Sequence, residues 1–253
     1  MRKKKQASAN KESSVVIFIV EGRSDENALR NWLEDICDTL QIEFRVVGTD
    51  PFTNPENRRK NPETVIEEMV KKELIRGHFS EDDLAMIVQI TDTDGVYIYE
   101  SAVIVSEERI EKMYYTDDNI VVKNEGQKKE IARERNRVKR NGLNRLSLIK
   151  EITGVNYKIL YFSRNLEHIT HDDPDMCNND KEEEADKFSD RFQSVSEFKE
   201  FFQNSNFAVD GSYEDTWKYI QQNARSLKRY SNFHLIFDFL ASITTIVGEK
   251  QRE

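Results

Sequence analysis

Two aspartates stand at the end of an apolar, β-branched run. Asp92 and Asp94 follow residues 87–91 and are followed at once by Gly95. Carboxylates at the end of a buried strand are unfavourable unless a cation compensates them. Mg²⁺ takes oxygen ligands, and one or two carboxylates can hold it against a phosphate. The spacing indicates metal-assisted phosphate chemistry, and the alternative is an Asp-x-Asp-Gly turn that binds no metal.

Two further acids follow strand-like runs. Glu21 comes directly after Val15–Val20, and Glu167 comes shortly after the run 157–162. Continuous runs of β-formers are typical of parallel strands that are buried on both faces. The carboxyl ends of parallel strands meet at one edge of a sheet, where ligands bind. We therefore expect four carboxylates in one crevice: Glu21, Asp92, Asp94 and Glu167. The alternative for Glu21 and Glu167 is that each only stabilises the N-terminus of the following helix, the role that we expect for Asp25 and Glu26.

Strand-like and helical patterns alternate along the first half of the chain. This order predicts an α/β fold, with a central, Rossmann-like parallel sheet flanked by helices. The predicted strands cover 15–20, 44–47, 85–91 and 157–162, with short strands at 96–105 and 120–122. The predicted helices cover 24–36 with Ser24 as N-cap, 62–76, most of 126–150 with a break at Asn141-Gly142, 195–204, 214–227 and 231–246.

The length of 253 residues suits one large α/β domain with an insertion. We expect a disordered basic arm at 1–13, a catalytic domain at 14–170 with an insertion at about 96–155, and an acidic loop plus a helical region at 171–253. No apolar run is long enough to span a bilayer, and the N-terminus does not resemble a secretory signal. Two cysteines, Cys37 and Cys177, cannot form a zinc cluster, and a cytoplasmic chain would keep them reduced.

Charge is segregated along the chain. The net charge of −9 argues against a protein that simply coats nucleic acid. Residues 127–145 nevertheless carry eight bases and two acids, whereas residues 171–190 carry nine acids and two lysines. A basic run is an ordinary solvated face in most proteins, but this one has few acids to match it and suits phosphate contacts. The bases expected to contact phosphate are Arg23, Arg164, Lys128, Lys129, Arg133, Arg137, Lys139 and Arg140.

The segment Val20-Glu21-Gly22-Arg23-Ser24-Asp25-Glu26, followed some seventy residues later by Thr91-Asp92-Thr93-Asp94-Gly95, resembles the Toprim fold. Topoisomerases, DnaG-type primases, OLD-family nucleases and ribosomal-RNA maturases share that fold. The resemblance covers about residues 14–170. It implies that Glu21, Asp92 and Asp94 hold Mg²⁺ or Mn²⁺ and act on nucleic-acid phosphodiesters, with Glu167 as the additional acid of the nuclease branches.

The branch of the Toprim family that the chain resembles is inferred from the motifs that the chain lacks. It has no Cys₄ zinc pattern, and it is too short for strand-passage modules. It is therefore most similar to the small OLD-like Toprim nucleases of bacterial anti-phage defence. That similarity implies a metal-dependent nuclease acting on DNA or RNA, with a separate ATPase partner, because the chain has no phosphate-binding P-loop of its own. The sequence leaves open whether the chain forms a homodimer.

Two other functions remain open from the sequence. Asp92-Thr93-Asp94-Gly95-Val96 also resembles the first motif of haloacid-dehalogenase-type phosphatases, in which the first aspartate is the nucleophile. Ser163 and the Asp172-Asp173 pair would then supply the later motifs. The third interpretation is a non-catalytic Toprim module that binds nucleic acid or a partner.

Overall fold

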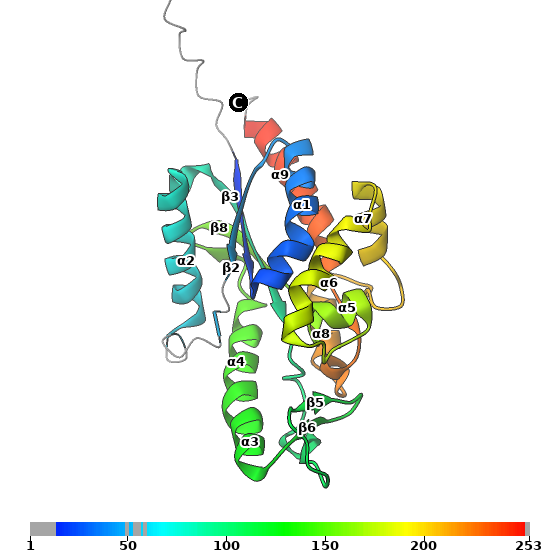
Figure 1. Cartoon of the computed structure of the whole chain (residues 1–253). Helices are drawn as coiled ribbons and strands as arrows, with labels where there is room; N and C mark the ends of the chain where they lie inside the picture. The colour runs from blue at the N-terminus through cyan, green and yellow to red at the C-terminus, as the bar shows by residue number, and fades with distance from the viewer. Residues whose placement is uncertain (1–13, 49–50, 53–56, 58–59, 251–253) are drawn as a thin grey trace, which may run out of the picture.

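The computed structural model describes residues 14–48, 51–52, 57 and 60–250 (Figure 1). The predicted basic arm at 1–13 lies outside the described residues. Among the described residues, no helix is both long and apolar enough to cross a membrane.

The centre of the molecule is a mixed sheet of mostly parallel strands. Four parallel strands run in the order β2-β1-β3-β8, and two short strands, β7 and β9, pair with β8 in antiparallel fashion. The strand order therefore reverses between β1 and β3, so these two neighbours form a switch point. The bounds are β1 Val15–Val20, β2 Glu43–Gly48, β3 Leu84–Asp92, β7 Glu151–Ile152, β8 Val155–Ser163 and β9 Tyr230–Ser231. The predicted α/β architecture is confirmed.

Helices cover both faces of this sheet. Figure 1 shows α2 on one side and α1, with α6 and α7 packed on it, on the other. The C-terminal region belongs to the same hydrophobic core, because the rings of Phe162 on β8 and Phe202 both pack on Phe233. The bounds are α1 Arg23–Thr39, α2 Pro62–Gly77, α5 Leu166–His171, α6 Asn178–Asp190, α7 Val195–Phe202, α8 Tyr213–Ile220 and α9 Ile236–Lys250, with short 3-10 turns at Glu81–Asp83, Arg225–Leu227 and Phe233–Leu235.

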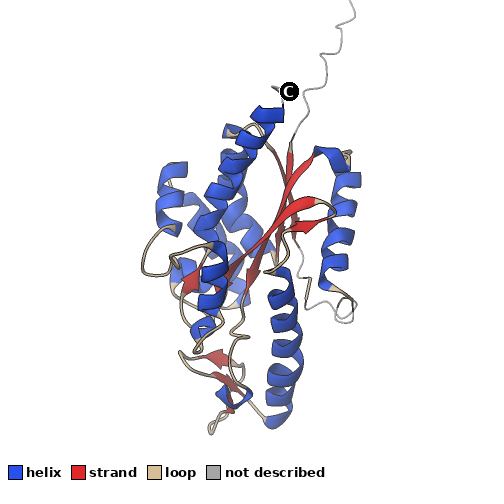
Figure 2. Ribbon diagram, turned by 180° about the vertical axis from the view of Figure 1, so that it is seen from behind, coloured by secondary structure: helices blue, strands red, loops and turns tan. Residues whose placement is uncertain are grey.

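The insertion between β3 and β8 extends beyond the carboxyl edge of the sheet (Figures 1 and 2). A second, small sheet in the order β4-β6-β5 packs beside one continuous helical rod made of α3, a π-helical segment η3, and α4. The bounds are η2 Glu100–Ala102, β4 Val103–Val105, β5 Tyr114–Tyr115, β6 Ile120–Val122, α3 Glu125–Lys129, η3 Glu130–Arg135 and α4 Asn136–Leu146.

Two predicted helix boundaries in the first two-thirds of the chain are wrong. The helix break at Asn141-Gly142 does not occur, because α4 continues to Leu146. Gly142 instead allows close packing, since a Cβ there would lie 2.3 Å from a ring carbon of Phe52. Ser24 is not the N-cap of α1, because the helix begins at Arg23 with Gly22 as N-cap.

Three predicted elements are shorter or shifted in the structure. The strand predicted at 96–105 is limited to Val103–Val105, and the helix predicted at 214–227 ends at Ile220. The last helix starts at Ile236 rather than 231, because the preceding segment pairs with β8. Asn232, which lies before this helix, accepts a hydrogen bond at Oδ1 from the backbone N–H of Tyr161 on β8, at 2.8 Å.

Candidate active site

Glu21 and Asp92 meet at the switch point between β1 and β3. The backbone N–H of Asp92 donates to Glu21 Oε1 at 3.1 Å, and the hydroxyl of Thr91 donates to the same oxygen. The parallel register of β1 and β3 brings these two acids together although they are about seventy residues apart in sequence. The expected convergence of Glu21 and Asp92 is therefore present.

The turn after β3 presents Asp94. Asp94 and Gly95 both have positive φ, at 49° and 66°, and the backbone N–H of Asp94 donates to the carbonyl of Arg164 at 2.9 Å. A Cβ on Gly95 would lie 2.4 Å from a methyl of Leu227, so both the left-handed backbone and the close packing favour glycine there. The turn ties the end of β3 to the end of β8.

The sequence predicted that Lys139 contacts phosphate at the surface. Instead, Lys139 lies buried among the acids. Its side chain is 1% exposed, and its ammonium lies 3.0 Å from the carboxylate of Glu21 and 2.6 Å from Asp94 Oδ2. The reason is its place on the helical rod, where it lies on the buried face with Ile131 and Leu143. A charge on the apolar stripe of an amphipathic helix was the sequence signal for this placement.

Arg135 adds a second cation from the same face, one helical turn before Lys139. Its guanidinium donates to the backbone carbonyl of Asp94 at 2.9 Å and to the hydroxyl of Tyr115 at 3.3 Å. Burial acts to raise the pKa of Asp94, but Lys139 and Arg135 together hold that pKa below its ordinary value. These two cations thus favour the ionised form of Asp94.

Asp25 belongs to the cluster although the sequence analysis assigned it only to the helix dipole. It is 7% exposed, and its Oδ2 accepts a hydrogen bond from the backbone N–H of Gly22 at 3.0 Å. Burial, followed by the charge of Glu167, raises the pKa of Asp25 to about 7. The sequence signal was again helical spacing, because Asp25 shares the buried face of α1 with Ala28 and Leu29.

Glu167 and Asp92 complete the set. Glu167 lies at the start of α5, is 6% exposed, and pairs with Lys181 of α6 at 2.9 Å, while its Oε2 has no hydrogen-bond partner among the described residues. Burial, followed by the charges of Asp25, Glu21 and Asp94, raises the pKa of Asp92 well above its ordinary value. All four predicted acids therefore lie in one cluster with Asp25.

The other predicted phosphate contacts fall in different places. Arg23 is exposed at the first position of α1, two residues after Glu21. Arg164 is 5% exposed, and its guanidinium lies 5.4 Å from the centre of the Tyr115 ring. The bases on the outer surface of the helical rod, away from the acids, are Lys128, Lys129, Arg133, Arg137 and Arg140.

The donor set fits a divalent cation in its chemistry. Hard cations take carboxylate oxygens, and the raised pKa values of Asp25 and Asp92, with the unpartnered Oε2 of Glu167, mark negative charge that lacks compensation. Among the described residues, however, no three acidic, histidine or cysteine side chains are grouped closely enough to hold a metal ion. Glu21 and Asp94 are both directed to Lys139, so a bound cation would have to compete with this ammonium.

Replacing Asp25 with Asn is expected to remove a pH-dependent loss of stability. The carboxyl keeps its proton up to about pH 7 in the fold, but loses it near pH 3.8 when unfolded. Stability should therefore fall as the pH rises from about 4 to 7, and stay lower above that. The shift corresponds to about 4 kcal/mol, and because neighbouring acids share this proton binding, we expect Asp25→Asn to gain about 2 kcal/mol at pH 8.

Urea unfolding at about pH 5 and pH 8, in chelator, would measure this difference. Asp35→Asn, on the exposed face of the same helix, is the matched control and should follow the wild type at both pH values. Equal pH dependence of wild type and Asp25→Asn would contradict the raised pKa of Asp25.

The chain has no match among protein-family models, curated proteins or solved structures. The resemblance of its motif pair to Toprim therefore stays a prediction. The structure itself defines the class of the protein as an α/β fold with a mostly parallel sheet and an acidic cluster at its switch point.

Proposed function

We propose that this protein cleaves phosphodiester bonds of nucleic acid in a reaction that depends on Mg²⁺ or Mn²⁺. The observation that carries the proposal is the gathering of five carboxyl groups at the carboxyl ends of β1, β3 and β8, beside a helical rod with a basic outer surface. Sites for charged ligands in open α/β sheets lie at such a switch point. A cluster of acids alone would repel a phosphate, so the proposal requires a cation.

The residues have distinct roles in this proposal. Glu21, Asp92 and Asp94 would hold the cation, which supplies an activated water and stabilises charge on the phosphate. Glu21 is oriented for this by its hydrogen bonds from Thr91 and the backbone of Asp92. Exposed Arg23, two residues after Glu21, is suited to bind the phosphate through two parallel hydrogen bonds. Glu167 of α5 forms an ion pair with Lys181 of α6 at the other side of the cluster.

The phosphatase alternative has less support. Ser163, which would serve a later phosphatase motif, is fully buried, and its hydroxyl donates to the backbone carbonyls of Ser226 and Lys228 at 2.9 and 2.7 Å. A phosphate at Asp92 would therefore not meet that hydroxyl. The ATPase partner, the homodimer, the cytoplasmic location and the role in anti-phage defence stay predictions of the sequence analysis.

The proposal is tested by a cleavage assay with purified protein. Plasmid, single-stranded DNA and RNA are incubated with Mg²⁺, Mn²⁺ or chelator, and a small aryl phosphate is offered in parallel. We expect nucleic-acid cleavage with either metal, none in chelator, and no hydrolysis of the aryl phosphate. Asp92→Asn protein, purified in the same way, controls for contaminating nucleases. Aryl phosphate hydrolysis alone would favour the phosphatase, and binding without cleavage would favour the non-catalytic module.

A further inference from the structure

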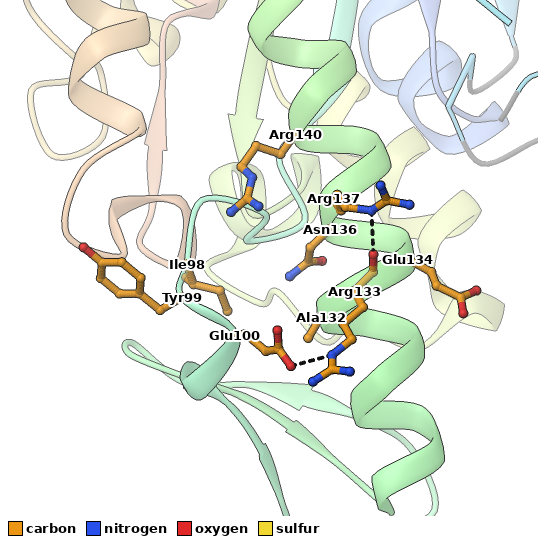
Figure 3. A pocket seen from close by; sticks show the side chains of 9 residues that line it. All are labelled: Ile98, Tyr99, Glu100, Ala132, Arg133, Glu134, Asn136, Arg137 and Arg140. Carbon is orange, nitrogen blue, oxygen red and sulfur yellow. Dashed lines mark hydrogen bonds and ion pairs between the residues drawn. The ribbon is translucent and has the colours of Figure 1, made fainter. Parts of the chain in front are cut away.

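A pocket opens on the outer side of the helical rod. It has a volume of about 440 Å³ and lies between the segment 98–100 and the junction of η3 with α4 (Figure 3). This volume is within the range of sites that hold small ligands. Arg133 and Glu100 form an ion pair of 2.7 Å at one side of the pocket, and Arg137 extends away from it. The carboxylate of Glu134, which also lines the pocket, is directed away from Arg140 (Figure 3). The polar side chains that remain for a ligand are Tyr99, Asn136 and Arg140.

Tyr99 stands at the edge of this pocket with its ring in solvent. The residue is 85% exposed, and its side chain makes no hydrogen bond or ring contact with any described residue. A single exposed aromatic side chain is common on protein surfaces. An exposed ring beside arginines is different, because the face of a nucleobase can stack on it while a guanidinium binds the adjoining phosphate.

Arg140 supplies the positive charge. It is half-buried, points into the pocket (Figure 3), and has no carboxylate within ion-pair distance among the described residues. Arg133 and Arg145 on the same rod are both neutralised, by Glu100 and Glu63. An arginine that lines a pocket and forms no ion pair with a carboxylate is suited to bind phosphate oxygens.

Asn136 links the pocket to the acids. It is 3% exposed, and its Oδ1 accepts two hydrogen bonds from Arg135, at 3.0 and 2.9 Å, which leaves its amide N–H groups to face the pocket. Arg135 also donates to the backbone carbonyl of Asp94. Arg135 therefore connects Asn136, in the pocket lining, to the turn that carries Asp94.

We propose that this pocket holds one nucleotide of a single-stranded nucleic acid, with its base stacked on Tyr99 and its phosphate bound by Arg140 and the amide of Asn136. The inference rests on the proposed function and names its substrate as unpaired DNA or RNA. A duplex does not fit this description, because its bases stack on one another and offer no free face to Tyr99. DNA and RNA both offer the base and the phosphate that this pocket would bind, and the binding test compares the two.

Binding is measured in chelator, so that cleavage plays no part. Fluorescence anisotropy follows labelled oligothymidylate, oligouridylate and a hairpin duplex on the full chain. We expect Tyr99→Ala to weaken single-strand binding about tenfold, and Tyr99→Phe to retain it, because stacking needs only the ring. Arg140→Gln should weaken binding and lower the salt dependence by about 0.7 in log–log slope. Tyr114→Ala, at a second exposed tyrosine, is the matched control and should leave binding unchanged.

The outcomes separate this inference from the nuclease proposal. Tyr99-dependent binding without cleavage in any metal would support the pocket and reject the nuclease. Metal-dependent cleavage with unchanged single-strand binding in Tyr99→Ala would overturn the pocket and leave the nuclease. An equal loss of duplex binding in Tyr99→Ala, or no binding of any oligonucleotide by the wild type, would also overturn the pocket.

Discussion

Replacing Asp92 with Asn is expected to lower metal-dependent cleavage of nucleic acid by about 10³-fold, equivalent to about 4 kcal/mol of transition-state stabilisation. Asparagine keeps the shape of the side chain but removes the negative charge that holds a cation. Its effect on stability should be the opposite, because the raised pKa of Asp92 shows that the folded state disfavours this charge. Loss of activity together with an unchanged or higher melting temperature would exclude unfolding as its cause.

Two further variants serve as the control and as the test between nuclease and phosphatase. Asp82→Asn, at an exposed position just before the start of β3, is the matched control and should keep full activity. Glu21→Gln should lose activity as Asp92→Asn does, although its amide oxygen can still accept the hydrogen bonds from Thr91 and Asp92. Normal activity in Glu21→Gln with none in Asp92→Asn would instead identify Asp92 as a nucleophile of the phosphatase type.

Replacing Lys139 with Met is expected to destabilise the protein by about 3–5 kcal/mol in chelator, because Glu21 and Asp94 then lose a buried cationic partner. In a domain of this size that loss corresponds to a melting temperature lower by about 10 °C. Mg²⁺ should recover much of it, since the same two carboxylates become available to a divalent cation and binding to the folded state stabilises it. The shift on adding Mg²⁺ should therefore be larger in Lys139→Met than in the wild type.

Thermal unfolding with chelator and with saturating Mg²⁺ measures both effects. Lys129→Met, the same substitution at an exposed position of the rod, should change neither the melting temperature nor its response to Mg²⁺. If Lys139→Met is destabilised but does not respond to Mg²⁺ more than the wild type, the acids around Lys139 do not form a cation site. The buried lysine would then be a structural counter-ion only.

The sequence by itself determined the sheet and the acids at its edge. The runs at Val15–Val20 and 157–162 are continuous and rich in β-formers, which is what a strand buried on both faces requires. Carboxylates placed directly after such runs must lie at the carboxyl edge once the strands are parallel. This rule predicts that four acids lie close together: Glu21, Asp92, Asp94 and Glu167. In the structure they lie in one cluster.

Only the tertiary structure decided how that negative charge is compensated. Eight bases occur in residues 127–145, and local sequence gives them equal standing as surface cations. The docking of the helical rod on the sheet edge buries Lys139 and leaves Arg140, its neighbour, facing a pocket. Asp25 likewise entered the cluster because α1 turns that face toward α5 and α6. Charges compensate one another through space, so residues far apart in the chain set the partner of each, and no local pattern records that choice.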